Sequence, residues 1–146
     1  MIKIAHRGNT EGSDTENENS PIYVDKALEK GYDSEIDVWV NDDKIFLGHD
    51  GPKYPIEKDW LFLRSDKLWC HAKNVEALDY LLSWERINCF WHQSDHYTIT
   101  SKKYIWAYPG YYGSSDRTIA VKPNDNIDLS KFIGICSNEI KKYEGF

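Results

Sequence analysis

Short apolar runs separated by polar segments predict strands along most of the chain. We expect extended segments at residues 2–7, 33–40, 44–50, 68–74, 87–93, 103–110, 117–123 and 131–138. The segments 33–40 and 44–50 flank the turn "NDD", so they predict a strand and its hairpin partner. Residues 9–19 contain no apolar side chain, which is typical of a loop.

Two segments show the periodicity of a helix instead. Ser20 and Pro21 predict a helix start, because Ser can cap free N–H groups and Pro suits the first helical turn. An apolar stripe with the spacing i, i+3, i+4 follows, and Gly31 closes this helix. Asn74 is placed to cap a second helix over residues 75–84.

The order of these elements predicts an α/β fold. Strands and helices alternate in the first half, which favours a parallel sheet with crossover helices. The second half reads as strands joined mostly by loops. A chain of 146 residues fits one domain, residues 1–146, with a single core.

Composition and charge exclude several classes of protein. The formal net charge of −6 argues against a binder of the phosphate backbone, so we expect no nucleic acid as a partner. Nowhere do eighteen apolar residues run together, which predicts no transmembrane segment. We also expect no secretion signal, because the amino-terminal residues enter a strand directly.

Three cysteines, Cys70, Cys89 and Cys136, lie in apolar stretches without the spacing of a zinc site. An odd number in such places is typical of free, buried thiols. We therefore predict no disulfide and a cytoplasmic location. Aromatic residues make up 14% of the chain, more than a core of this size requires, so some are expected to line a surface cleft.

Polar residues with catalytic potential gather late in the predicted strands. The carboxyl ends of parallel strands are where functional side chains collect. Glu35 and Asp37 lie two apart on one strand face and repel each other unless a cation neutralises them, which a divalent metal does well. His6 ends the first strand, and His71 and Lys73 share one face of the segment "LWCHAKN".

Together these groups favour phosphate ester chemistry. Histidines near a metal can act as acid and base, because an imidazole titrates near neutral pH. A lysine and an arginine beside them would stabilise anionic oxygens. His92 is interpreted first as a buried imidazole beside Phe90, and His96 as a solvated loop residue. Trp106 and Tyr108 share a strand face and fit either the core or a cleft wall; we assign Trp106 to substrate binding.

The order of four motifs is similar to that of a known family. "IAHRG", "ENSP", "ALEKGYDSEIDVWV" and "FLGHD" cover residues 4–50 almost without gaps. This part of the chain resembles the glycerophosphodiester phosphodiesterase family, within the phospholipase C-like phosphodiesterases built on TIM barrels. Farther on, His71 and Lys73 stand where the family has a Glu-x-Lys segment, and Ser137 and Asn138 stand in place of its closing Thr-Asp segment.

The resemblance implies a fold and a set of roles. It implies a compact, abbreviated TIM-type (β/α) barrel with several helices missing or reduced to loops, because such barrels usually need about 250 residues. Exposed barrel wall would then favour a homo-oligomer. His6 and His49 would be the acid/base pair, and Arg7 would contact the phosphate of a small phosphodiester substrate.

The resemblance also implies a metal centre. Glu35 and Asp37 would bind a divalent ion, which polarises the phosphoryl oxygen and activates an attacking hydroxyl group of the substrate, and Lys73 would neutralise the phosphoryl oxygens. His71 replaces the family's third acidic ligand, so Mg²⁺, Ca²⁺ and Mn²⁺ all stay open as the ion.

Two other functions stay open as well. One is a catalytically degenerate module that binds a phosphorylated ligand without cleaving it, which the replacement at His71 motivates. The other is a sugar-cleaving enzyme that uses Glu35 and Asp37. We rank it last, because glycoside hydrolysis needs two carboxylates on opposite sides of the bond, about 5 Å or more apart.

Overall fold

The computed structural model describes residues 1–113 and 115–146, which form one sheet with a few helices. The strands are β1 (Ile2–His6), β2 (Asp33–Asn41), β3 (Lys44–Leu47), β4 (Tyr54–Ile56), β5 (Leu68–Ala72), β6 (Asn88–Phe90), β7 (Tyr97–Ile99), β8 (Ile105–Ala107), β9 (Thr118–Val121) and β10 (Gly134–Ser137). The helices are α1 (Pro21–Glu29), α2 (Lys58–Leu63) and α3 (Val75–Leu82), with the short 3-10 helices η1 (Leu129–Lys131) and η2 (Ile140–Tyr143).

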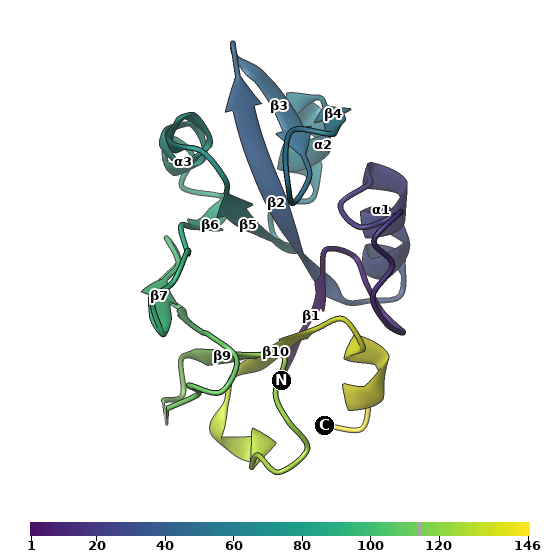
Figure 1. Cartoon of the computed structure of the whole chain (residues 1–146), viewed down its shortest axis with the longest axis vertical. Helices are drawn as coiled ribbons and strands as arrows, with labels where there is room; N and C mark the ends of the chain where they lie inside the picture. Colours follow the sequence, from purple (N-terminus) through teal and green to yellow (C-terminus); the bar gives the residue numbers. More distant parts are fainter. Residues whose placement is uncertain (114) are drawn as a thin grey trace.

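The sheet is mixed and curled. Parallel pairing runs through β6, β5, β2, β1, β10, β9 and β8 in that spatial order. Antiparallel strands are added beside this series, with β3 on β2, β4 on β3 and β7 on β8. Figure 1 shows the strands following an arc with α1, α2 and α3 outside it.

The expectation of an abbreviated TIM-type (β/α) barrel is therefore wrong. The described residues form ten strands in a curled, half-barrel sheet of mixed direction, and they contain only three short α-helices. The physical reason lies in the connections. The segments between β6 and β10 lack an apolar helical stripe and fold as turns, antiparallel pairing and η1. The expectation that loops join most strands of the second half agrees with the structure.

The predicted helix starts are confirmed. The Ser20 side chain accepts a hydrogen bond from the Tyr23 backbone N–H at 3.3 Å, with Pro21 as the first helical residue of α1. Asn74 accepts from the Ala77 backbone N–H at 3.1 Å and so caps α3.

Among the described strands and α-helices, three were not predicted, namely β4, α2 and β7, and neither were the 3-10 helices η1 and η2. Prolines obscured β4, α2 is a single six-residue segment without a side-chain cap, and β7 follows a polar loop. Contacts with neighbouring elements stabilise each of these three elements more than its local sequence preference does.

The two faces of the sheet bury separate cores. Outside, a cluster around Ile36, Val38 and Leu81 packs the first half of the sheet against the α-helices. A smaller outer cluster packs β1 and β10 against η2. Inside the curl lies an aromatic and aliphatic cluster that includes Trp69 and Trp106. Alternation along each strand separates these layers, since successive side chains point to opposite faces.

The inner core ends where the polar residues begin. Ile4 belongs to the inner cluster, and His6, two residues later on the same strand face, lies nearer the carboxyl end. Trp69 and His71 repeat this arrangement on β5. On the inner face of the sheet, the polar side chains thus form one layer toward the carboxyl ends of the strands, next to a layer of apolar side chains.

The three cysteines are free and buried, as predicted from their apolar surroundings. Burial raises the pKa of the Cys70 and Cys136 thiols, which disfavours the reactive thiolate. The exposed barrel wall that motivated a homo-oligomer is not seen in β9 and β10, where every residue is buried within the chain.

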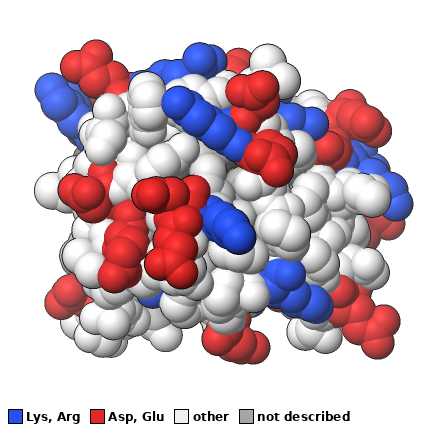
Figure 2. Space-filling view, turned by 90° about the horizontal axis from the view of Figure 1, so that it is seen from above, with Lys and Arg blue, Asp and Glu red and all other residues white. Residues whose placement is uncertain are grey.

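The surface carries charges of both signs. Figure 2 shows several Asp and Glu side chains close together left of centre, while other acidic and basic side chains are scattered over the rest of this face. Among the residues that the structure describes, none of the helices has the length and apolar character needed to cross a membrane.

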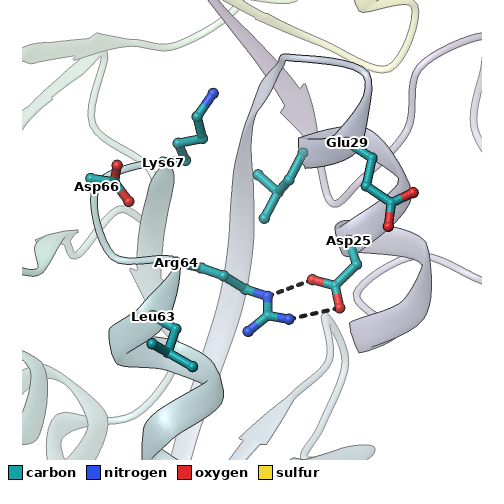
Figure 3. A pocket seen from close by; sticks show the side chains of 7 residues that line it. Asp25, Glu29, Leu63, Arg64, Asp66 and Lys67 are labelled. Carbon is teal, nitrogen blue, oxygen red and sulfur yellow. Dashed lines mark hydrogen bonds and ion pairs between the residues drawn. The ribbon is translucent and has the colours of Figure 1, made fainter.

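A depression of about 460 Å³ lies between α1 and the segment that enters β5. Figure 3 shows Arg64 reaching across it to Asp25, with Nε–Oδ1 and Nη2–Oδ2 distances of 2.5 and 3.0 Å. This bidentate pair ties α1 to the segment after α2. The depression lies beside the segments that enter β2 and β5, at the opposite strand ends from those that carry the predicted site residues.

Candidate functional site

Most of the predicted site residues line one cavity at the carboxyl ends of the parallel strands. The cavity has a volume of about 480 Å³. Its lining includes seven of the eight predicted residues, namely His6, Arg7, Glu35, His49, His71, Lys73 and Trp106. The eighth, Asp37, is fully buried behind the lining. The structure thus brings the predicted residues together, while their roles stay predictions.

Strand register explains why these side chains meet. In the parallel pair of β1 and β2, His6 lies beside Glu35. In the parallel pair of β2 and β5, Asp37 lies beside His71. Because parallel strands begin at the same edge of a sheet, residues late in each strand gather at the opposite edge.

The Asp37 carboxylate is the centre of a buried ionic network. Its Oδ2 atom lies 3.1 Å from Arg7 Nε and accepts a hydrogen bond from Asn19 Nδ2 at 2.9 Å. Its Oδ1 atom lies 3.3 Å from His71 Nδ1 and 3.8 Å from Lys73 Nζ. Burial alone would raise the pKa of Asp37, but His71 and Arg7 hold it well below its usual range.

His71 faces this carboxylate and Glu35 with one ring nitrogen. Its Nε2–H donates to the His92 backbone carbonyl at 2.9 Å, so Nδ1 is the nitrogen that faces the carboxylates. Glu35 Oε1 lies 3.7 Å from this Nδ1 atom. Burial lowers the pKa of His71, but the opposing effect of Asp37 and Glu35 is larger and raises this pKa to about 9.

Glu35, Asp37 and His71 also have the arrangement of a metal-binding group. One ligand atom from each lies within 4.8 Å of the others. Asp37 Oδ1 is buried without a hydrogen-bond partner, and the cations that now face it are His71 Nδ1 and Lys73 Nζ, which a metal ion would replace. A backbone carbonyl that fixes the second ring nitrogen is typical of ligating histidines. Two oxygens and one nitrogen suit Mn²⁺ or a similar ion better than Mg²⁺ or Ca²⁺.

His6 is oriented as a base. Its Nδ1–H donates to Asn138 Oδ1 at 2.6 Å, and Asn138 in turn donates from Nδ2 to Ser13 Oγ at 2.7 Å. The neutral ring therefore carries its lone pair on Nε2, which lies 3.8 Å from Glu35 Oε2. Burial lowers the pKa of His6, against the opposing charge of Glu35, so the neutral ring predominates at neutral pH.

His49 reaches the cavity from the loop after β3. Its Nδ1–H donates to Asp50 Oδ1 at 2.7 Å, which leaves Nε2 as the second nitrogen. The turn before it requires glycine, because a Cβ atom on Gly48 would lie 2.1 Å from the Gly51 carbonyl oxygen. The Gly48 carbonyl accepts a hydrogen bond from Trp39 Nε1 at 2.7 Å. This hydrogen bond from β2 thus fixes the loop conformation that places His49 at the cavity.

Arg7 and Lys122 share an unusual backbone conformation. They directly follow β1 and β9, and their φ angles are 58° and 46°, in the left-handed region that L-residues rarely adopt. Both line the cavity. Such strain concentrates at functional sites.

Several lining residues were not assigned to the site from the sequence, although Tyr108 was left open as a cleft wall. They are His92, Gln93, Tyr108, Pro109, Val121 and Lys122. Lys122 could have been found, because it follows the apolar strand 118–121 as Arg7 follows β1. His92 was assigned to the core, yet it is only half-buried and faces Tyr108. Trp106 fits both of its interpretations, since it lines the cavity and packs on Phe90 at 4.7 Å between ring centroids.

Known proteins give no further guidance. No family model, no curated protein sequence and no solved structure matches this chain. The function is therefore argued from the geometry of the site.

Proposed function

We propose that this cavity binds a small phosphodiester and cleaves it with His6 and His49 as base and acid. One observation carries the proposal: both histidines line a cavity that also holds Arg7, Lys73 and Lys122. Three cations suit a phosphoryl group, and two imidazoles with Nδ1 held by a neighbour suit proton transfer through Nε2.

His6 takes the proton of the attacking hydroxyl group through Nε2. The attacking oxygen forms a bond to phosphorus, and the bond from phosphorus to the leaving alcohol breaks. His49 gives a proton to the departing oxygen. The cations of the cavity bind the phosphoryl oxygens, whose negative charge grows during the transfer.

Glu35, Asp37 and His71 are the residues that would hold a divalent metal. When bound there, such an ion would polarise a phosphoryl oxygen. Both carboxylates are buried and contact Arg7. Glu35 accepts a hydrogen bond from the Arg7 backbone N–H, and Asp37 pairs with the Arg7 side chain. These contacts keep the two carboxylates fixed. This site is part of the proposal, and metal analysis of the purified protein tests it directly.

Turnover of a phosphodiester panel tests the proposal. The purified protein with Mn²⁺ or Mg²⁺ is assayed on glycerophosphodiesters, lysophospholipids and aryl phosphodiesters. We expect His6→Gln to lower the rate by a factor of about 100 to 10,000, because a positioned acid or base contributes that much.

His96→Gln is the matched control, since His96 is exposed and stacks on Tyr111 outside the cavity lining. It is expected to keep the full rate. A silent panel, or a His6→Gln variant as active as the control, would contradict the proposal.

One observation favours a second function, the binding of a phosphorylated ligand without cleavage. Arg7 and Lys73 already lie 3.1 and 3.8 Å from the Asp37 carboxylate, so its charge is balanced without a metal ion. Calorimetry distinguishes the two functions. Tight binding of phosphate esters, together with an unhydrolysed panel and a metal-free protein, would favour the binding function.

A further inference from the structure

The cavity has two halves with different chemistry. The charged half contains His6, Arg7, Glu35, His49, His71, Lys73 and Lys122, from β1, β2, β5 and the loops after β1, β3, β5 and β9. The other half, here called the aromatic half, contains His92, Gln93, Trp106, Tyr108, Pro109 and Val121. None of these six residues is acidic. A ligand that fills both halves must carry an anionic group and an uncharged one.

Tyr108 is the most accessible aromatic residue of this half for a ligand, and its backbone is held by two hydrogen bonds. The residue is 46% exposed, although it lines the cavity. Its backbone N–H donates to the His96 carbonyl at 2.8 Å, and its carbonyl accepts from Tyr111 N–H at 2.9 Å. The first bond joins the two loops that carry the aromatic half, and the second closes a turn within the loop of Tyr108.

The His92 ring stands against Tyr108. The two ring planes meet at 82°, with centroids 5.8 Å apart. His92 is itself held, because its Nε2–H donates to the Asp95 carbonyl at 2.5 Å. The pair forms a corner of two aromatic side chains in the cavity lining, and Tyr108 is partly exposed. A flat ring can stack on one of these side chains while its edge meets the other.

We propose that the aromatic half selects substrates whose ester arm carries a planar aromatic ring, which stacks on Tyr108. This inference rests on the proposed function, since it places the phosphoryl group among the cations of the charged half. Stacking on an exposed aromatic side chain favours planar rings over saturated rings of similar size. The cations Arg7, Lys73 and Lys122 in the same cavity disfavour a cationic arm such as a quaternary ammonium group.

Binding of phosphate monoesters tests the inference without requiring turnover. Calorimetry compares phenyl phosphate, cyclohexyl phosphate, choline phosphate and inorganic phosphate on the full chain. We expect phenyl phosphate to bind about five-fold more tightly than cyclohexyl phosphate. Tyr108→Ala should bring this ratio close to one, and Tyr108→Phe should keep it, because the ring is preserved.

Tyr97→Ala is the matched control. Tyr97 has the same 46% exposure but lies on β7 outside the cavity lining. It is expected to keep the five-fold ratio. Equal affinities for the two ring compounds, an unchanged ratio in Tyr108→Ala, or tightest binding of choline phosphate would each overturn the inference.

The same experiment separates this inference from the proposed function. If inorganic phosphate binds but the phenyl ring adds nothing, the substrate class is wrong and the phosphodiester proposal stands. If none of the four compounds binds, the proposed function fails, and the inference fails with it.

Discussion

The charged half and the aromatic half of the cavity are built in opposite ways. In the charged half, Glu35 and the residue behind it, Asp37, are almost completely buried, and ion pairs and hydrogen bonds connect them to their neighbours. In the aromatic half, Tyr108 is nearly half exposed and is held mainly through backbone hydrogen bonds of its loop. The first half is part of the folded core, and the second is a surface placed beside it.

This difference shows in which half a loss of ligand binding can be distinguished from a loss of stability. Removing one partner of a buried ionic network leaves other charges without compensation, so a lost activity there can reflect a damaged fold. Removing an exposed ring leaves few atoms unsatisfied. Substitutions in the aromatic half therefore report on ligand binding more cleanly than those in the charged half.

The largest effect is expected for Asp37→Asn. Arg7, His71 and Lys73 would lose their shared carboxylate in a buried place, so the free energy of unfolding should fall by about 3 kcal/mol. Urea unfolding measures the change. Asp66→Asn, at an exposed position, is the control and should stay within about 0.5 kcal/mol of the wild type. A loss below about 1 kcal/mol in Asp37→Asn would contradict the claim that the charged half supports the fold more than the aromatic half does.

Mn²⁺ should stabilise the charged half specifically. At about one hundred times its dissociation constant, a ligand that binds only the folded state adds about 2.7 kcal/mol. For a chain of this size that corresponds to about 5 to 10 °C in melting temperature. Thermal unfolding with and without Mn²⁺ measures it.

Glu35→Gln should abolish this shift, because it removes a proposed ligand, while Glu85→Gln, at an exposed position, should retain it. An equal shift in all three proteins would mean that the ion binds elsewhere.

The Arg64–Asp25 pair provides a reference for an ion pair outside the cavity. Its side chains are 26% and 31% exposed, so solvent screens the attraction. We expect Asp25→Asn to lower the free energy of unfolding by about 0.5 to 1 kcal/mol, less than Asp37→Asn, despite the bidentate geometry in Figure 3. Urea unfolding of both variants under the same conditions gives the ratio. A larger loss at Asp25 would show that burial does not control the size of these effects.

The smallest effect on stability is expected in the aromatic half. Tyr108→Ala should change the free energy of unfolding by about 0.5 kcal/mol or less, because the ring is exposed and its loop is held by backbone groups. Urea unfolding checks this value beside the binding assay. A loss above about 2 kcal/mol would mean that Tyr108 supports the fold, and the two halves would then not differ as proposed.

Local chemistry explains which elements could be predicted. The caps at Ser20 and Asn74 act on backbone groups only a few residues away, so their sequence signals were sufficient. β7 and α2 have weak signals of their own, and they form because β8 and the outer core hold them. The barrel was wrongly predicted because the four motifs of residues 4–50 say nothing of how later strands connect.

The residues of the candidate site can be divided in the same way, into those that local sequence patterns predict and those that they do not. The sequence by itself determined which side chains fall late in strands and on which strand face, because a period of two residues is a local property. It therefore indicated His6, Glu35, Asp37 and His71. Lys122 and Tyr108 enter the site through the position of their loops, which local patterns do not fix.

The tertiary structure alone decided how these residues meet. Register between strands distant in the chain placed His71 beside Asp37, and the curl of the sheet brought the loop of Tyr108 opposite the loop of His49 into one cavity lining. Such contacts depend on packing summed over the whole chain, in which no single segment specifies its partner. The sequence thus determined the chemistry of each strand end, and the fold decided that the strand ends share one cavity.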